Sequence, residues 1–323
     1  MDHSAEPPPV LERPVQAFAD AFDLRGAPCD ASRPVAPGPT EALLGEADTD
    51  PDVEEDWLAL PGRDGERIRV RILRPAGNED PMPVILFLHG LGGVSTTAFA
   101  HQRLLEDLVL GADATVVVPE YDLSAASPYP VAVEQGYTVA RWIADHGAEW
   151  RLDGCRIAVF GVSTGANLAA ALTLLAKERG GVDILHHVLV CPVLDASMST
   201  ASYRRFARGY GVGDAAMRDF WQRYVPDAAR REEITASPAR ATTDELRGLP
   251  PALVLTAEAD VARDEGEAYA ARLREAGVSV VSARYHGTIH GFVLFDALRH
   301  SDTARAARTQ ALDTLHVALH RGL

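Results

Sequence analysis

The sequence predicts an α/β protein in which a mostly parallel sheet carries helices on both faces. Short apolar runs rich in β-branched residues recur along the chain, and longer helical patterns separate them. Strand–helix alternation of this kind predicts parallel strands, because each crossover helix returns the chain to the same end of the sheet. A third observation is the alternation of apolar and charged residues over 68–73, which is typical of a half-exposed antiparallel strand.

The predicted elements follow one another in a regular order. The dipeptide Asp64-Gly65 favours a hairpin turn ahead of the antiparallel strand. The buried strands are predicted at residues 84–88, 115–118, 156–160, 188–191, 252–256 and 278–283. The helices are predicted at residues 132–146, 166–179, 265–276 and 303–319.

One long segment interrupts this alternation. Residues 195–247 contain helical patterns and several aromatic side chains but no convincing strand. An insertion of this size predicts a helical cap over the carboxyl edge of the sheet, where ligands bind in open α/β folds. Residues 1–50 are rich in proline, alanine and acids, which predicts an arm or lid. The expected domains are an N-terminal cap segment (1–50), the core (51–194 and 248–323) and a cap insertion (195–247).

Composition restricts the partners and the compartment. The net charge of −15 disfavours nucleic acid and anionic membranes, because phosphate binding needs a basic surface. The amino terminus lacks the pattern of a signal peptide, and no apolar run approaches the ~20 residues of a membrane span. The cysteines Cys29, Cys155 and Cys191 lack metal-ligand spacing, and a structural disulfide is not expected. We therefore expect a cytoplasmic protein without a cofactor or metal site.

A motif typical of a nucleophilic serine lies at Gly161-Val162-Ser163-Thr164-Gly165. In a nucleophile elbow the serine takes a strained backbone conformation, so its close neighbours must be small. The turn exposes the hydroxyl above the sheet and places the following N–H groups at a helix N-terminus. A bare Gly-x-Ser-x-Gly also occurs by chance. The strand pattern before it and the helix pattern after it favour Ser163 as a nucleophile over a simple strand–helix turn.

A serine nucleophile needs a base, usually a histidine oriented by an acid. After a nucleophile elbow the partners follow in the order serine, acid, histidine. Asp260 comes just past the strand at 252–256, and His290 follows the last strand. Both therefore belong to the sheet edge where the elbow lies, and we predict a triad of Ser163, Asp260 and His290. The alternatives are His286 for the histidine and Glu258 or Asp264 for the acid.

A glycine-rich loop follows the first core strand at His89-Gly90-Leu91-Gly92-Gly93. It lacks the Lys-Ser/Thr ending of a phosphate-binding loop. Acyl transfer needs N–H donors for the developing oxyanion, so a loop ahead of a serine elbow is best explained as an oxyanion loop.

Together these motifs resemble the hormone-sensitive-lipase-like branch of the α/β-hydrolase fold, which includes many bacterial carboxylesterases. The likeness runs from about residue 57 to the carboxyl terminus and includes the segments 119–134, 192–195, 237–238, 260–265 and 290–292. The resemblance implies a cap built from the amino-terminal segment and the insertion, and it allows a homodimer. It also implies that the oxyanion donors are the N–H groups of Leu91, Gly92 and Thr164.

This chain departs from the family pattern at three places. Leu91 stands where the family usually has the second glycine of its loop, Val162 and Thr164 replace the usual aspartate and alanine of the elbow, and residues 124–126 replace Ala-Pro-Glu. The resemblance implies a serine carboxylesterase that hydrolyses short- to medium-chain esters, including deacetylation of a small metabolite. The departures motivate one alternative, a dehydratase or cyclase that uses the oxyanion hole and His290 without hydrolysis. A non-catalytic binding protein is disfavoured by the apparently intact triad.

Overall fold

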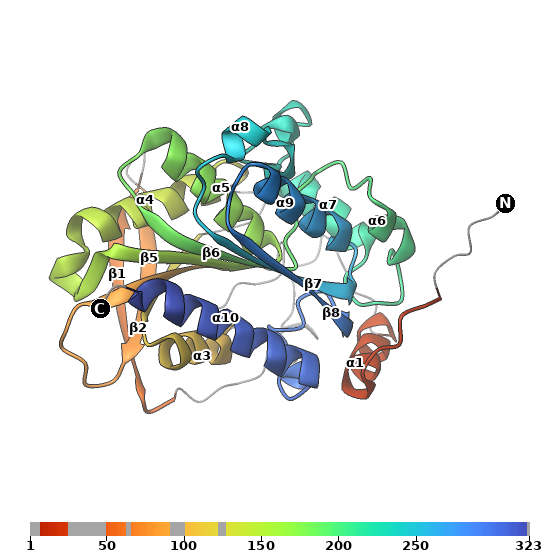
Figure 1. Cartoon of the computed structure of the whole chain (residues 1–323), viewed down its shortest axis with the longest axis horizontal. Helices are drawn as coiled ribbons and strands as arrows, with labels where there is room; N and C mark the ends of the chain where they lie inside the picture. The colour runs from red at the N-terminus through yellow and green to blue at the C-terminus, as the bar shows by residue number, and fades with distance from the viewer. Residues whose placement is uncertain (1–6, 25–49, 63–65, 91–100, 122–126, 322–323) are drawn as a thin grey trace.

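An eight-stranded sheet forms the centre of the computed structural model (Figure 1). The structure describes residues 7–24, 50–62, 66–90, 101–121 and 127–321. The strand order is β1-β2-β4-β3-β5-β6-β7-β8, in which β1, β2 and β4 pair antiparallel and all other neighbours pair parallel. The predicted fold class is therefore confirmed. The strands are β1 (Val53–Pro61), β2 (Arg67–Pro75), β3 (Met82–Leu88), β4 (Thr115–Glu120), β5 (Leu152–Val162), β6 (Ile184–Val190), β7 (Ala252–Ala259) and β8 (Val280–Ile289).

Helices cover both faces of the sheet (Figure 1). One face carries α4, α5 and α9, and the other carries α3 and α10. Every residue of β3 is buried, as a central parallel strand between two helical layers requires. The longer helices are α1 (Arg13–Leu24), α3 (Gln102–Ala112), α4 (Val131–His146), α5 (Thr164–Arg179), α7 (Asp214–Tyr224), α9 (Arg263–Glu275) and α10 (Asp302–His320).

The segment between β6 and β7 is helical wherever it has regular structure. It contains α6 (Ala201–Arg205), α7 and α8 (Thr243–Leu246), and its described residues form no strand. Most of its aromatic side chains are buried, namely Tyr203, Phe206, Phe220, Trp221 and Tyr224, whereas Tyr210 is partly buried; Phe220 stacks on Tyr224. The division into cap and core stays a prediction. Most of the predicted amino-terminal cap segment and the predicted hairpin turn lie outside the described residues.

Helix α1 packs beside the carboxyl-terminal part of the chain. Glu12, just ahead of the helix, donates its N–H to the Gly287 carbonyl at 2.9 Å. The Glu12 carboxylate accepts the N–H groups of Asp302 and Thr303 at the start of α10. Residues far apart in the sequence therefore meet beside the loop that follows β8.

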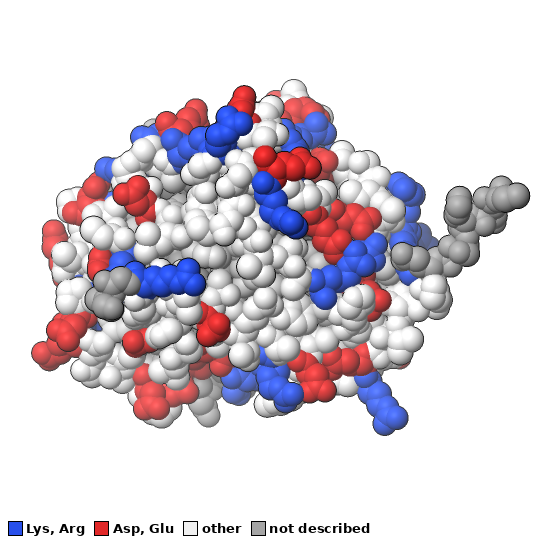
Figure 2. Space-filling model, in the orientation of Figure 1, with Lys and Arg blue, Asp and Glu red and all other residues white. Residues whose placement is uncertain are grey.

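The surface mixes charges of both signs. Acidic and basic side chains are interspersed over the face shown in Figure 2, where the basic ones do not gather into one patch. Within the described ranges, no helix combines the length and apolarity that a membrane span requires. The absence of nucleic-acid binding, a homodimer and a cytoplasmic location stay predictions.

Buried histidines make the fold sensitive to acid. Burial is the main cause that lowers the pKa of His101 and His187 to about 3 and that of His89 and His186 to about 4. In the unfolded chain these rings bind protons near pH 6.5, so unfolding takes up protons at any pH between the folded and unfolded values. The contribution of these four histidines to stability is therefore complete above pH 6.5 and is lost progressively as the pH drops toward 3.

We expect each fully buried histidine to cost about 2–3 kcal/mol of unfolding free energy between pH 7.5 and pH 4.5. Urea denaturation at the two pH values measures this loss. His187→Leu removes one buried ring and should reduce the loss, whereas the same substitution at the exposed His300 should leave it unchanged. An equal loss in wild type and His187→Leu would contradict the prediction.

Candidate active site

Ser163 occupies a sharp turn between β5 and α5. β5 ends at Val162 and α5 begins at Thr164, so the serine alone links strand to helix. Its backbone angles are φ 59° and ψ −121°, a conformation that L-residues rarely adopt. The Ser163 side chain is directed to the carboxyl edge of the sheet, where the N-terminus of α5 favours negative charge.

Two glycines make this turn sterically feasible. A Cβ atom on Gly161 would lie 2.3 Å from the carbonyl oxygen of Gly165. A Cβ atom on Gly165 would lie 2.0 Å from the carbonyl oxygen of Leu88, at the end of β3. Both contacts are far inside van der Waals distance, so the spacing of glycines around the serine follows from backbone packing.

The structure brings Ser163, Asp260 and His290 into one hydrogen-bonded chain. His290 Nδ1 lies 2.9 Å from Asp260 Oδ1, and His290 Nε2 lies 2.7 Å from Ser163 Oγ. A carboxylate only accepts hydrogen bonds, so Nδ1 carries the proton and Nε2 accepts the serine O–H. All three side chains are buried among the described residues. This arrangement can deprotonate the serine as it attacks an electrophile.

The alternative residues are engaged elsewhere. His286 pairs with Glu258 at 3.2 Å, and its side chain is 71% exposed. Asp264 accepts the Ser202 N–H at 2.8 Å and pairs with Arg263. None of these contacts involves Ser163, so the geometry favours Asp260 and His290 over their rivals.

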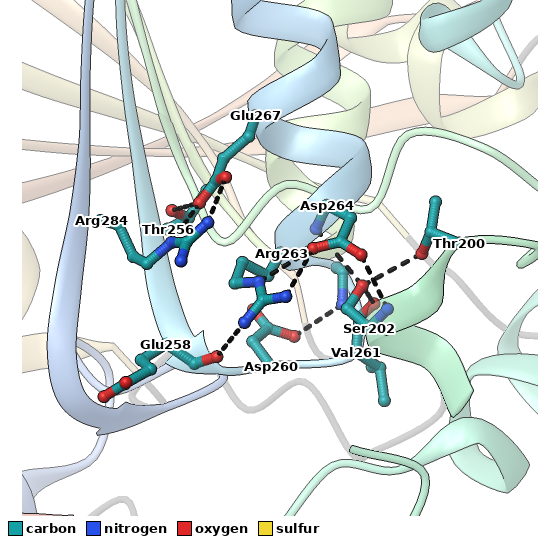
Figure 3. A network of polar contacts seen from close by, with 11 residues as sticks. Thr200, Ser202, Thr256, Glu258, Asp260, Val261, Arg263, Asp264, Glu267 and Arg284 are labelled. Carbon is teal, nitrogen blue, oxygen red and sulfur yellow. Dashed lines mark hydrogen bonds and ion pairs between the residues drawn. The ribbon is translucent and has the colours of Figure 1, made fainter. Parts of the chain in front are cut away.

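Backbone and side-chain bonds hold the loop that carries Asp260 (Figure 3). Asp260 lies between β7 and α9, and its Oδ1 accepts the Ala262 N–H at 2.8 Å. Arg263 donates to the Glu258 carbonyl at 3.2 Å and to Asp264 at 2.9 Å. Ser202 donates its hydroxyl to the Val261 carbonyl at 2.6 Å, which ties the loop to α6. The acid is thus fixed from both sides.

The start of the glycine-rich loop rests against the elbow. A Cβ atom on Gly90 would lie 2.4 Å from the Val162 carbonyl oxygen. The His89 ring stacks on Tyr121 at 4.1 Å, and Tyr121 donates its hydroxyl to the His89 carbonyl. Leu91 and Gly92, two of the predicted oxyanion donors, lie outside the described residues. The third, Thr164, is the first residue of α5, where the backbone N–H has no partner within the helix.

This geometry agrees with the comparison with known families. The sequence profile described as the α/β hydrolase fold matches residues 85–294. The chain belongs to the α/β-hydrolase family. The match contains the elbow, Asp260 and His290, and it confirms the predicted resemblance.

Several relatives of this α/β hydrolase are named as esterases. The carboxylesterase NlhH of Mycobacterium tuberculosis is 34% identical over 259 residues, which cover 78% of this chain and 79% of the relative. The ethyl acetate hydrolase of Pseudomonas putida is 33% identical over 254 residues, which cover 78% and 79%. A solved thermostable esterase from Pseudomonas putida superposes with a TM-score of 0.90 at 40% identity and covers 97% of this chain and 99% of its own. These relatives give no support to the dehydratase or cyclase alternative.

One residue near the triad is missing from the sequence predictions. Cys191 directly follows β6 and donates its N–H to the Leu255 carbonyl of the neighbouring β7 at 2.7 Å. Its Sγ, an Asp260 carboxylate oxygen and a His290 ring nitrogen lie within 4.8 Å of one another. The position just after a parallel strand places it at the carboxyl edge, which is the signal that could have identified it.

Proposed function

We propose that this α/β hydrolase is a serine carboxylesterase that hydrolyses short- to medium-chain esters of small molecules. The observation that carries the proposal is the continuous hydrogen-bonded chain from Asp260 through His290 to Ser163. Its esterase relatives support the same reaction.

In the proposed mechanism, Ser163 Oγ attacks the ester carbonyl while His290 Nε2 takes the hydroxyl proton. Asp260 keeps the imidazole in the tautomer that leaves Nε2 free to accept, and it stabilises the imidazolium that forms. The protonated histidine then gives its proton to the leaving alcohol. Water repeats the sequence on the acyl-enzyme and releases the acid.

The oxyanion of the tetrahedral intermediate needs donors already in place. The Thr164 N–H at the start of α5 is one proposed donor, and the helix N-terminus favours the charge. The N–H groups of Leu91 and Gly92 are the other two proposed donors. A backbone donor does not require glycine, so Leu91 is compatible with this role.

A chain-length profile tests the proposal. We expect turnover of p-nitrophenyl acetate and butyrate, lower turnover of long-chain esters, and covalent labelling by a fluorophosphonate. Mass spectrometry should locate the label on Ser163. Tight binding of esters without turnover or labelling would contradict an esterase and favour a non-catalytic binding protein.

A further inference from the structure

The two carboxylate oxygens of Asp260 have unequal surroundings. Oδ1 accepts from both His290 Nδ1 and the Ala262 N–H. Oδ2 is buried and has no hydrogen-bond partner among the described residues. A buried carboxylate oxygen without a donor is costly, so a donor to Oδ2 would stabilise the carboxylate in its present orientation.

The Cys191 side chain lies beside this carboxylate. The cysteine and the aspartate are each 1% exposed. The thiol sulfur lies within 4.8 Å of an Asp260 carboxylate oxygen and of a His290 ring nitrogen, and it interacts with the backbone at Ala257 and Gly291. The sulfur therefore lies between β6, β7 and the loop that carries His290. Burial, and after it the negative charge of Asp260, raises the pKa of the Cys191 thiol. The sulfur therefore keeps its proton at neutral pH and has an S–H to donate.

The backbone directs this side chain. Cys191 has φ 46°, in the left-handed region, and its N–H is bonded to the Leu255 carbonyl on β7. The chain thus leaves β6 in a fixed turn that faces the end of β7, from which Asp260 follows. Two neighbouring strands of the sheet, β6 and β7, therefore bring Cys191 and Asp260 together.

We propose that Cys191 is a positioning residue of the triad, whose S–H donates to the free oxygen of Asp260 and fixes the carboxylate toward His290. This inference rests on the proposed esterase function and adds a fourth residue to it. The thiol takes no part in bond making. Its donation holds the carboxylate orientation and withdraws part of the negative charge that the imidazolium meets during the reaction.

Two further titratable groups lie near this pair. Glu265 of α9 and Tyr203 of α6 both interact electrostatically with Asp260. Burial is the main cause that raises the pKa of each well above its ordinary value. Neither group is altered in the variants described below, so a difference in the acid limb of the pH profile between those variants reports the exchange at residue 191.

A matched pair of variants tests the proposal. Cys191→Ala removes the donor, and Cys191→Ser restores a donor while differing from alanine by one hydroxyl oxygen. For Cys191→Ala we expect kcat on p-nitrophenyl butyrate to fall about three- to tenfold with KM within about twofold. We also expect the acid limb of kcat/KM to move about half a pH unit higher, because a less neutralised carboxylate holds the imidazolium proton more tightly.

Cys191→Ser should return kcat and the acid limb of kcat/KM to their wild-type values, or move the acid limb to lower pH. The same substitution at the exposed Cys155, Cys155→Ala, should change neither. If the serine and alanine variants share one profile, or if alanine keeps the wild-type kcat and acid limb, the proposal is wrong and Cys191 only fills space. Thermal denaturation confirms that each variant is folded. Failure of the esterase function itself is distinguishable, since wild type would then neither turn over esters nor react with a fluorophosphonate.

Discussion

Ser163→Ala is expected to lower kcat on p-nitrophenyl butyrate by about 10⁴- to 10⁶-fold, the range seen when a triad nucleophile is removed. The physical reason is that His290 Nε2 is directed at the Ser163 hydroxyl, so the substitution removes the oxygen proposed to form the acyl-enzyme. The measurement is the steady-state rate, together with loss of fluorophosphonate labelling.

A second serine supplies the control for this experiment. Ser282 lies exposed on β8, and Ser282→Ala should retain full activity and labelling. Alanine at 163 meets the same positive φ as serine, so the variant should melt within a few degrees of wild type. Retained turnover in purified Ser163→Ala would remove Ser163 from the mechanism.

Asp260→Asn is expected to lower kcat by about 10³- to 10⁴-fold at neutral pH. The amide has N–H donors as well as an oxygen, so it can hold the imidazole in the tautomer with the proton on Nε2. That tautomer cannot accept the proton of Ser163. The measurement is kcat across pH, with the folded state checked by circular dichroism.

The rival acid provides a matched substitution. Glu258 pairs with the exposed His286, and Glu258→Gln should change kcat by less than about threefold. If Glu258→Gln were as damaging as Asp260→Asn, the acid of the triad would be assigned wrongly.

The core of the fold is predictable from the sequence because buried parallel strands are apolar on both faces. The predicted strands at 84–88 and 115–118 coincide with β3 and β4 to within a few residues. β1 and α3 are among the elements that lie outside the predictions. β1 begins with Val53 and three acids and alternates only weakly, since it is an edge strand with little burial. α3 has buried Leu104, Leu105 and Leu108 at helical spacing, so the sequence contains a pattern that predicts a helix there.

The proposed triad can be predicted from chain order, but the choice between neighbouring residues needs the structure. β8 extends through His286 to Ile289, which places His286 on the strand and His290 immediately beyond its end. The register, in which Ala259 pairs with Ile289, brings the residues that follow, Asp260 and His290, side by side. The number of residues between two positions in the sequence does not determine such a register. The approach of Cys191 to Asp260 likewise depends on β6 and β7 being neighbours.

The contacts of Glu12 and helix α1 have a consequence for exchanging parts between related esterases. Glu12 bonds to Gly287 and to the start of α10, and Phe18 of α1 packs against Phe295 at 4.7 Å. Both Gly287 and Phe295 flank His290 within a few residues. A chimera that takes its amino-terminal helix from a relative must therefore inherit the 287–303 segment from the same parent. The amino-terminal helix and the 287–303 segment are thus coupled around His290, the proposed base.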